Sequence, residues 1–258
     1  MAQSEDGAVL AGTNSGIFAL DGDSWKPKNT IANTIPKPVP EVLHGKRVVI
    51  EKKVKAPPRE LGTRVYGLDL SGDAWLASTA GGLYTSNDKG ETWQGGPAVG
   101  GVDYLSVAAH GLVMVAARPT AVVLSNDAGQ TWWPMGIPTA LTRIQRVAFS
   151  TDGTLWVGAR EGVYFTRDKG KTWMWVHRLP LSGVDDLYYD ARQNRVLVCS
   201  RGSDLVYAID PTTLDWKWMS TGFPLVLVRP AGDRLMAATL NAGVLAESEG
   251  PKSEVGQK

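Results

Sequence analysis

An eight-residue pattern that recurs three times constrains the fold of this chain more than any other feature. The copies share the form Ser/Thr-x-Asp-x-Gly-x-Thr-Trp and occupy residues 86–93, 125–132 and 166–173. Their aspartates, at positions 88, 127 and 168, stand 39 and 41 residues apart. A fixed period in this range is typical of solenoids, propellers and other arrays. The chain is therefore predicted to be a repeat protein.

Each position of this octapeptide suits a strand-turn-strand hairpin. An aspartate in a turn can accept hydrogen bonds from backbone N–H groups two residues on. The glycine two places later adopts a positive φ that a side chain would resist. The tryptophan carries apolar surface into the outgoing strand, and its N–H can still find a partner. We assign these residues to structure rather than to catalysis: Asp88, Gly90, Trp93, Asp127, Gly129, Trp132, Asp168, Gly170 and Trp173.

Weaker copies extend the repeat over most of the chain. Pairs of apolar segments, like those upstream of each octapeptide, also occur at residues 9–13 with 16–19, 196–200 with 205–208 and 235–239 with 243–246. A further apolar segment, such as residues 64–70, precedes most pairs. Four short strands in each period of about 40 residues describe a propeller blade. The predicted fold is all-β, a β-propeller of about six four-stranded antiparallel blades, either incomplete or part of a longer repeat protein.

The octapeptide matches the Asp-box, also called the BNR repeat. The chain thus resembles the sialidase-like superfamily of propellers, which includes sialidases, sortilin-type receptors, xyloglucanases and photosystem II assembly factors. The resemblance covers about residues 7–247 and is specific only at the three octapeptides. Short blades, the lack of an obvious catalytic set and an arginine patch make the chain look most like the photosystem II assembly factors. This resemblance implies a non-enzymatic scaffold that holds a protein partner.

The composition fits this fold and argues against several other functions. Hydrophobic residues make up 43% of the chain, and 29 glycines with 15 prolines suit many tight turns. A net charge of +1 argues against nucleic acid and membrane partners. The single cysteine, Cys199, is predicted to be a buried structural thiol. Because His44, His110 and His177 lack ligand spacing, we expect no metal site and no cofactor.

The predicted domain organisation is a propeller at residues 1–247 and a polar, disordered tail at 248–258. A Pro/Lys-rich insertion at about 27–63 breaks the period, and its prolines exclude a regular central strand. We interpret it as an inter-blade hairpin, either a docking arm or a solvated loop. Val9 aligns with the second strand of a blade, which leaves no room for a first. The amino terminus has no signal-peptide pattern, which predicts a cytoplasmic protein, or an exported one if the chain is a fragment of a longer protein.

Arginines recur at one place in three successive repeats. Arg118, Arg160 and Arg201 stand 42 and 41 residues apart, each in the turn between the second and third strands. Arginines at or near first-strand entries are Arg64, Arg143 and Arg146. A guanidinium is always charged and offers a planar fork of donors to carboxylates. We expect these residues to form a binding face for an acidic protein or peptide; alternatively, exposed turns merely tolerate arginine.

A glycoside hydrolase, sialidase-like or xyloglucanase-like, is the alternative function, with a carbohydrate as ligand. The Arg-Ile-Pro signature of sialidases is absent, since the nearest string, at residues 142–145, has glutamine in place of proline. Hydrolysis needs two carboxylates that face one cleft. The candidates are Glu161 with Asp185 or Asp186, because adjacent residues of a strand point to opposite faces and cannot supply both groups. We therefore favour a protein that is not an enzyme.

Overall fold

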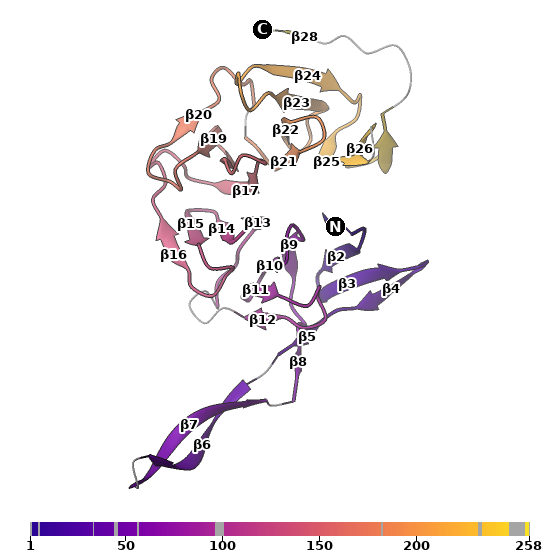
Figure 1. The fold of residues 1–258 in the computed structure, drawn as a ribbon. Helices are drawn as coiled ribbons and strands as arrows, with labels where there is room; N and C mark the ends of the chain where they lie inside the picture. The colour runs from indigo at the N-terminus through magenta and orange to yellow at the C-terminus, as the bar shows by residue number, and fades with distance from the viewer. Residues whose placement is uncertain are drawn as a thin grey trace. The chain divides into compact units, whose positions relative to one another are not determined.

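All regular secondary structure that the computed structural model describes is β-strand (Figure 1). It describes residues 2–4, 6–32, 34–43, 46–55, 57–95, 101–181, 183–231, 234–247 and 256–257, with only the backbone for 34–43, 46–55, 231 and 256–257. The chain divides into two compact units, residues 1–102 (unit 1) and 103–258 (unit 2). His44 and most of the 248–258 tail lie outside the described residues.

Unit 1 contains two four-stranded antiparallel sheets, in which each strand pairs with the next along the chain. Blade 1 consists of β1 (Ala2–Gln3), β2 (Val9–Thr13), β3 (Gly16–Asp21) and β4 (Ser24–Pro27). Blade 2 consists of β9 (Val65–Asp69), β10 (Trp75–Thr79), β11 (Gly82–Ser86) and β12 (Gln94–Gly95). The expectation that blade 1 has no room for a first strand is wrong, because β1 pairs with β2 through Ala2 and Leu10. Two residues suffice for this strand.

The insertion between these blades contains two strand pairs. β5 (Thr30–Ile31) pairs with β8 (Arg59–Glu60). Between them, β6 (Thr34–Leu43) and β7 (Lys46–Lys55) form an antiparallel hairpin whose register runs from Thr34 opposite Lys55 to Leu43 opposite Lys46. Pro36, Pro38 and Pro40 thus lie in a hairpin strand outside the blades, where a missing N–H costs no hydrogen bond within a central strand.

Unit 2 contains four sheets of the same antiparallel kind. Blade 3 consists of β13 (Ser106–His110), β14 (Val113–Arg118), β15 (Ala121–Ser125) and β16 (Trp133–Met135). Blade 4 consists of β17 (Ile144–Phe149), β18 (Leu155–Ala159), β19 (Gly162–Thr166) and β20 (Met174–Trp175). Blade 5 consists of β21 (Asp186–Asp190), β22 (Arg195–Cys199), β23 (Leu205–Ile209) and β24 (Trp216–Ser220), with β28 (Gly256–Gln257) paired to β24. Blade 6 consists of β25 (Leu225–Ala231), β26 (Arg234–Thr239) and β27 (Val244–Ala246).

The predicted fold class is confirmed: the chain is an all-β, six-bladed β-propeller of antiparallel blades. Blades 1 to 5 each have four consecutive strands, and blade 6 has three among the described residues. None of the described elements is a helix long and apolar enough to cross a membrane.

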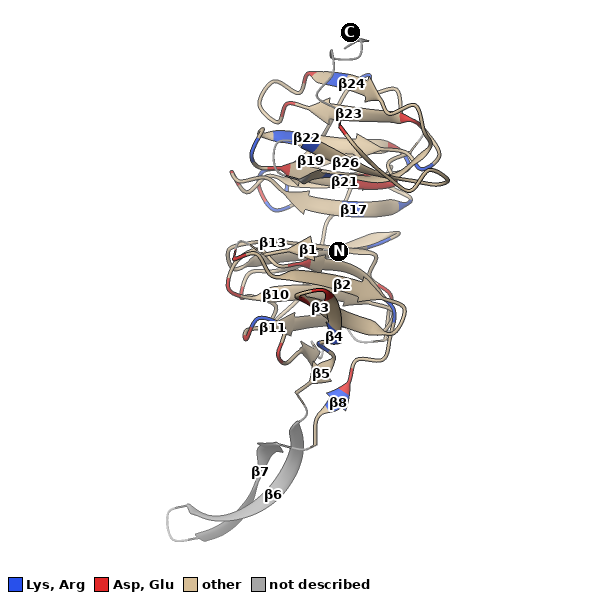
Figure 2. Cartoon of the chain, turned by 90° about the vertical axis from the view of Figure 1, so that its right-hand side faces the viewer, with Lys and Arg blue, Asp and Glu red and all other residues tan. Residues whose placement is uncertain are grey.

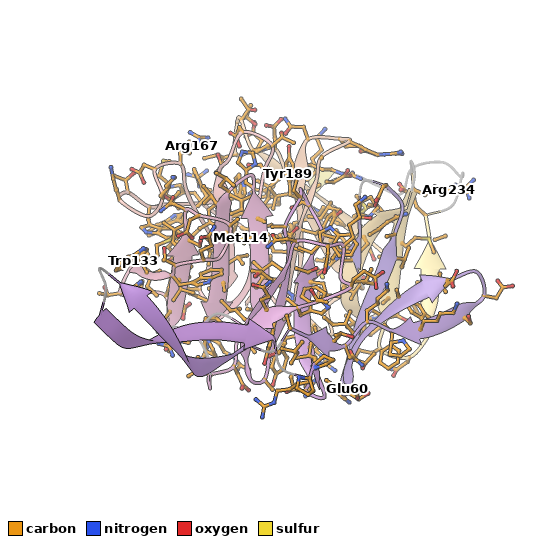
Figure 3. All side chains as sticks on the ribbon, turned by 60° about the horizontal axis from the view of Figure 1, so that its bottom comes forward. Glu60, Met114, Trp133, Arg167, Tyr189 and Arg234 are labelled. Carbon is orange, nitrogen blue, oxygen red and sulfur yellow. The ribbon has the colours of Figure 1, made fainter. Side chains whose placement is uncertain are left out.

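The hydrophobic cores lie between neighbouring blades. One cluster joins Val115 of β14 to Val157 of β18, and the next joins Trp156 of β18 to Val198 of β22. Successive residues of β18 therefore fill two different cores, so both faces of this strand are buried. This burial explains why the second strands are continuous apolar runs instead of alternating ones. Figure 3 shows Met114, fully buried, among the packed side chains, and Trp133, 63% exposed, at the margin.

The three octapeptides form the same hydrogen-bonded turn between the third and fourth strands of blades 2, 3 and 4. In residues 125–132, Asp127 Oδ1 accepts from Thr131 N at 2.8 Å and from Ser125 Oγ at 2.7 Å. Thr131 Oγ1 donates to Asp127 Oδ2, and Gly129 N donates to Ser125 Oγ at 2.8 Å. The same bonds recur around Asp88 and Asp168. One carboxylate thus ties the entry of each turn to its exit.

Two of the three octapeptides also attach their hairpin to the preceding blade. Trp93 Nε1 donates to Lys28 O at 2.9 Å, and Trp173 Nε1 donates to Gly136 O at 2.9 Å. Trp132 Nε1 instead donates to Gly129 O of its own turn at 3.0 Å. A Cβ on Gly170 would approach Met135 Cγ of blade 3 to 2.6 Å, so this glycine also permits close packing of two blades.

The residue before the glycine of each octapeptide also has a left-handed backbone conformation, which the sequence pattern did not predict. Lys89, Ala128 and Lys169 have φ of 55°, 54° and 60°. The left-handed conformation costs a residue with a Cβ about 1–2 kcal/mol. This cost exceeds the loss of conformational entropy that makes a glycine about 0.5–1 kcal/mol less favourable than alanine. We expect Ala128→Gly to raise the free energy of unfolding by about 0.5–1 kcal/mol and Ala128→Val to lower it by about 1–3 kcal/mol. Urea unfolding of the two variants measures this, and equal effects would contradict a strained turn.

Candidate functional site

Backbone hydrogen bonds bring the turn after each second strand next to the following blade. Ile144 N donates to Pro119 O at 2.8 Å, and Val184 N donates to Ala159 O at 3.0 Å. Leu225 N donates likewise to Ser203 O at 2.8 Å. These bonds place the second-to-third strand turns of blades 3, 4 and 5 beside the first-strand entries of blades 4, 5 and 6. The shared end of the blades carries the arginines that we call the turn surface: Arg118, Arg143, Arg160 and Arg201.

Three of these arginines are exposed and one is partly buried. Arg118 ends β14 opposite Ala121, and its Nε is buried with no hydrogen-bond partner among the described residues. Arg160 and Arg201 follow β18 and β22, and both are exposed. Arg143 is adjacent to Arg160, since its carbonyl accepts from Arg160 N at 2.9 Å. In the described part of unit 2, none of the four guanidiniums forms an ion pair.

The carboxylates near these turns are bonded to other groups. Glu161 accepts from Thr142 N at 3.2 Å and from Thr142 Oγ1. Burial raises the pKa of Glu161, but the Thr142 hydrogen bonds and the Arg160 charge outweigh this effect and lower it overall. Asp185 Oδ2 accepts from Arg201 N at 2.9 Å, and Asp204 accepts from Ser220 Oγ. These three carboxylates thus bond to groups other than the four guanidiniums.

The turn surface is a set of separate cations and not a field of one sign. Figure 2 shows Lys/Arg and Asp/Glu segments interspersed at the strand ends. Individual donors must therefore supply any recognition of an anion.

Arg146 does not belong to the turn surface, because it bonds to an acid on the neighbouring first strand. The strands β17, β21 and β25 lie side by side. Arg146 Nε donates to Asp186 Oδ1 at 3.4 Å, and Arg229 Nη2 donates to the same oxygen at 3.0 Å. Arg229 Nη1 and Val228 N donate to Asp186 Oδ2. Asp186 is 3% exposed, so one buried carboxylate joins blades 4, 5 and 6.

Arg229 was missed by sequence reasoning. It lies beyond the entry of its strand, directly after the apolar run 225–228, so its place in the repeat did not match that of the other arginines. Its guanidinium lies 4.8 Å from the ring centroid of Tyr188. Burial lowers the pKa of Arg229, but the Asp186 charge and hydrogen bonds outweigh this effect and raise it. A charged residue directly after an apolar segment was the available signal.

The structure gives the remaining sequence candidates other contacts. Arg64 belongs to unit 1, where its guanidinium lies 5.1 Å from the ring centroid of Tyr66. The carboxylates of Glu161, Asp185 and Asp186 bond to different partners. A search of the described residues finds no group of three His, Cys, Asp or Glu that could hold a metal. Cys199 is buried, and this burial raises its pKa to about 12.

Comparison with known proteins finds one curated relative by sequence. The photosystem II assembly lipoprotein Ycf48 of Synechococcus sp. (strain CC9902) is 29% identical over 89 residues, which cover 34% of this chain and 27% of that protein. The chain thus spans about a quarter of the curated relative that it matches. No family model matches the chain.

Solved structures resemble the fold over more of the chain. The extracellular domain of BT4673 from B. thetaiotaomicron has a TM-score of 0.69 at 15% identity and covers 99% of this chain, which spans 32% of that one. A structure of YCF48 bound to D1 peptide has a TM-score of 0.57 at 16% identity, covering 70% of this chain and 62% of that one. An ancestral GH74 enzyme has a TM-score of 0.65 at 14% identity, covering 98% of this chain and 36% of that one. At such identities the likeness shows the propeller fold alone.

Proposed function

We propose that this chain is a non-enzymatic protein-binding or assembly scaffold of the Asp-box/BNR-repeat propeller type. Its turn surface recognises an acidic segment of a partner protein. The observation that carries the proposal is the repetition of a guanidinium at the same end of three successive blades, Arg118, Arg160 and Arg201, without an ion pair among the described residues. Structural arginines are usually paired, whereas these offer free donors.

The comparisons support a peptide ligand. Ycf48 is named as an assembly protein, and a solved YCF48 structure contains a D1 peptide. We extend the principle of peptide binding to this chain, and not the identity of that peptide. The GH74 likeness supports the alternative hydrolase less well, because Glu161, Asp185 and Asp186 each bond to a different neighbour.

The chemistry of the turn surface suits carboxylates on an extended segment. A planar guanidinium binds a carboxylate through two parallel hydrogen bonds. Carboxylates spaced along a peptide could engage the arginines of consecutive blades together, which raises affinity without any single strong contact. Because exposed charges are screened within about 8–10 Å, binding should weaken with added salt.

The test is binding of a fluorescently labelled octaglutamate peptide, followed by anisotropy. We expect the triple Arg118/Arg160/Arg201→Glu variant to weaken binding about tenfold or more, because each change replaces attraction by repulsion. The matched control is Lys169/Lys171/Lys217→Glu, which changes the net charge of unit 2 equally at other exposed sites. We expect it to leave affinity within about threefold. Equal losses in both variants, or binding of octaglutamine as tight as octaglutamate, would overturn the proposal.

A further inference from the structure

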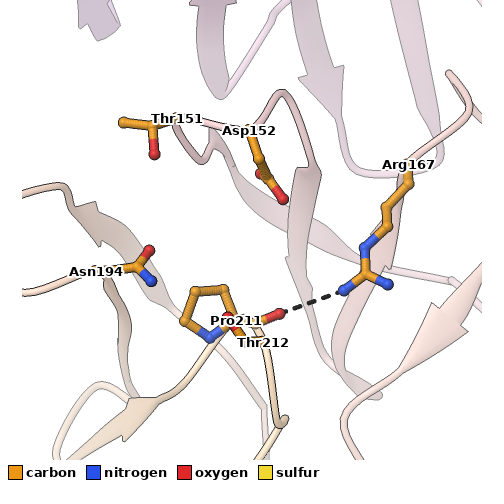
Figure 4. A pocket seen from close by; sticks show the side chains of 6 residues that line it. All are labelled: Thr151, Asp152, Arg167, Asn194, Pro211 and Thr212. Atoms are coloured by element: carbon orange, nitrogen blue, oxygen red, sulfur yellow. Dashed lines mark hydrogen bonds between the residues drawn. The ribbon is translucent and has the colours of Figure 1, made fainter.

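Four turns of blades 4 and 5 line a solvent-open pocket of about 400 Å³ (Figure 4). Thr151 and Asp152 come from the β17–β18 turn and Asn194 from the β21–β22 turn. Pro211 and Thr212 come from the β23–β24 turn, and Arg167 comes from the third octapeptide. These turns lie at the strand ends opposite to those of the turn surface. The pocket is therefore a separate site.

Arg167 departs from the pattern of its own repeat. The corresponding residues of the other two octapeptides are Asn87 and Asn126. The longer side chain lies over the Phe165 ring at 5.4 Å and donates from Nη2 to Pro211 O at 3.3 Å, a bond drawn in Figure 4. These two contacts hold the guanidinium at the pocket. Its other N–H groups have no partner among the described residues, so they can donate to a ligand.

The opposite wall is held in place by Tyr189. Its hydroxyl donates to Asn194 Oδ1 at 2.8 Å and pairs with Thr151 Oγ1 at 2.9 Å. Because Oδ1 of Asn194 is used in this way, its amide N–H₂ is left to donate. In Figure 4 the Asn194 and Asp152 side chains point toward the space that Arg167 approaches from the other side.

Asp152 supplies a fixed acceptor. Its Oδ1 accepts from Ser150 Oγ at 2.6 Å and Thr154 N at 3.0 Å, and its Oδ2 accepts from Thr154 Oγ1 at 3.0 Å. One lone pair of Oδ2 therefore remains for a ligand. Burial raises the pKa of Asp152, but these hydrogen bonds and the Arg167 charge outweigh it and lower the pKa, so the carboxylate is ionised.

We infer that this pocket binds a small, neutral, polyhydroxylated molecule, one hexose unit in size. One cation and one anion, Arg167 and Asp152, face the same space, so an added charge of either sign meets repulsion from one of them. The lining carries both donors and acceptors, and a hydroxyl group can bond to either. A pair of neighbouring ring hydroxyls fits a guanidinium fork on one side and a carboxylate oxygen on the other. The volume lies in the usual range for small-molecule sites.

Saturation-transfer NMR and titration with D-glucose, D-galactose and D-mannose test the inference, with acetate, inorganic phosphate and methylammonium as charged probes. We expect at least one hexose to bind saturably and none of the charged probes to compete with it. Arg167→Asn introduces the residue that the other two octapeptides have at this position, so we expect the fold to be preserved. It should weaken binding about tenfold, the loss expected of a hydrogen bond from a charged group.

Two further variants separate the site from its surroundings. Thr212→Val, which exchanges a hydroxyl for a methyl group, should weaken hexose binding, whereas Asn126→Ala, at the equivalent turn of blade 3, should not. The Arg118/Arg160/Arg201→Glu variant should bind hexose normally. The hexose result can therefore be judged separately from the proposed protein-binding function. The inference is overturned if no hexose saturates, if acetate or phosphate binds more tightly, or if Arg167→Asn binds equally well at an unchanged melting temperature.

Discussion

Asp186→Asn should lower the free energy of unfolding by about 3 kcal/mol. The substitution removes the one anion that Arg146 and Arg229 share, and it leaves two guanidiniums facing each other at the edges of three blades. Each of these arginine side chains is 33% exposed, so water screens part of the repulsion and the loss falls at the low end of the range for broken buried pairs. Urea unfolding monitored by tryptophan fluorescence measures it.

The adjacent acid provides a matched control. Asp185 is partly exposed and accepts only from Arg201 N in the described structure, a bond that an asparagine oxygen can keep. Asp185→Asn should therefore cost less than about 0.5 kcal/mol. Replacing the whole cluster by apolar residues, as in Asp186→Leu with Arg146→Leu and Arg229→Met, should recover most of the loss, because no unpaired charge remains. A loss from Asp186→Asn no larger than that from Asp185→Asn would show that the cluster is not coupled.

The second large effect is a steep loss of stability in acid. Hydrogen bonds from Thr131 lower the pKa of Asp127 to about 2, and hydrogen bonds from Thr172 do the same for Asp168. The pKa of Asp88 is also lowered, since burial raises it but hydrogen bonds from Thr92 and Ser86 outweigh this. Aspartate in an unfolded chain titrates near 3.9. Between pH 4 and pH 2 the unfolded state thus binds more protons than the folded one.

The sign of the effect follows from this difference. The stabilisation by these carboxylates is complete above the unfolded pKa and is lost as the pH falls through the folded pKa values. The urea midpoint should therefore be flat near neutral pH and fall steeply below about pH 4. In the Asp127→Asn/Asp168→Asn variant, the free energy of unfolding should depend less steeply on pH below about pH 4. The decrease in slope should correspond to up to about two fewer protons taken up on unfolding. Parallel pH profiles of the two proteins would exclude the octapeptide carboxylates as the cause.

The strands of this protein could be predicted because the information for them is local. The octapeptide at 125–132 carries its own turn chemistry, and the segments at residues 9–13 and 16–19 coincide with β2 and part of β3. The left-handed φ of Ala128 could not be predicted in the same way. Nothing in an alanine favours that conformation, so it is imposed by the bonds that close the turn.

Contacts between blades could not be predicted because they join residues about 40 positions apart. Arg146 was assigned to a binding face and Asp186 to a hydrolase alternative, yet they bond to each other. Their pairing depends on the register of β17 against β21, which the periodicity gives only to within a residue or two. The pocket at Arg167 was missed for the same reason, since it exists only where two blades meet.

The tryptophan bonds to the preceding blade give assembly of this protein a direction. Trp93 donates to Lys28 and Trp173 to Gly136, residues that leave the ribosome earlier than the indoles that bind them. The first-strand entries at Ile144, Val184 and Leu225 likewise donate to carbonyls upstream. Each newly made blade within a unit can therefore form these bonds to a blade that was synthesised before it. Such a chain is suited to fold during its own synthesis, from the amino terminus onward.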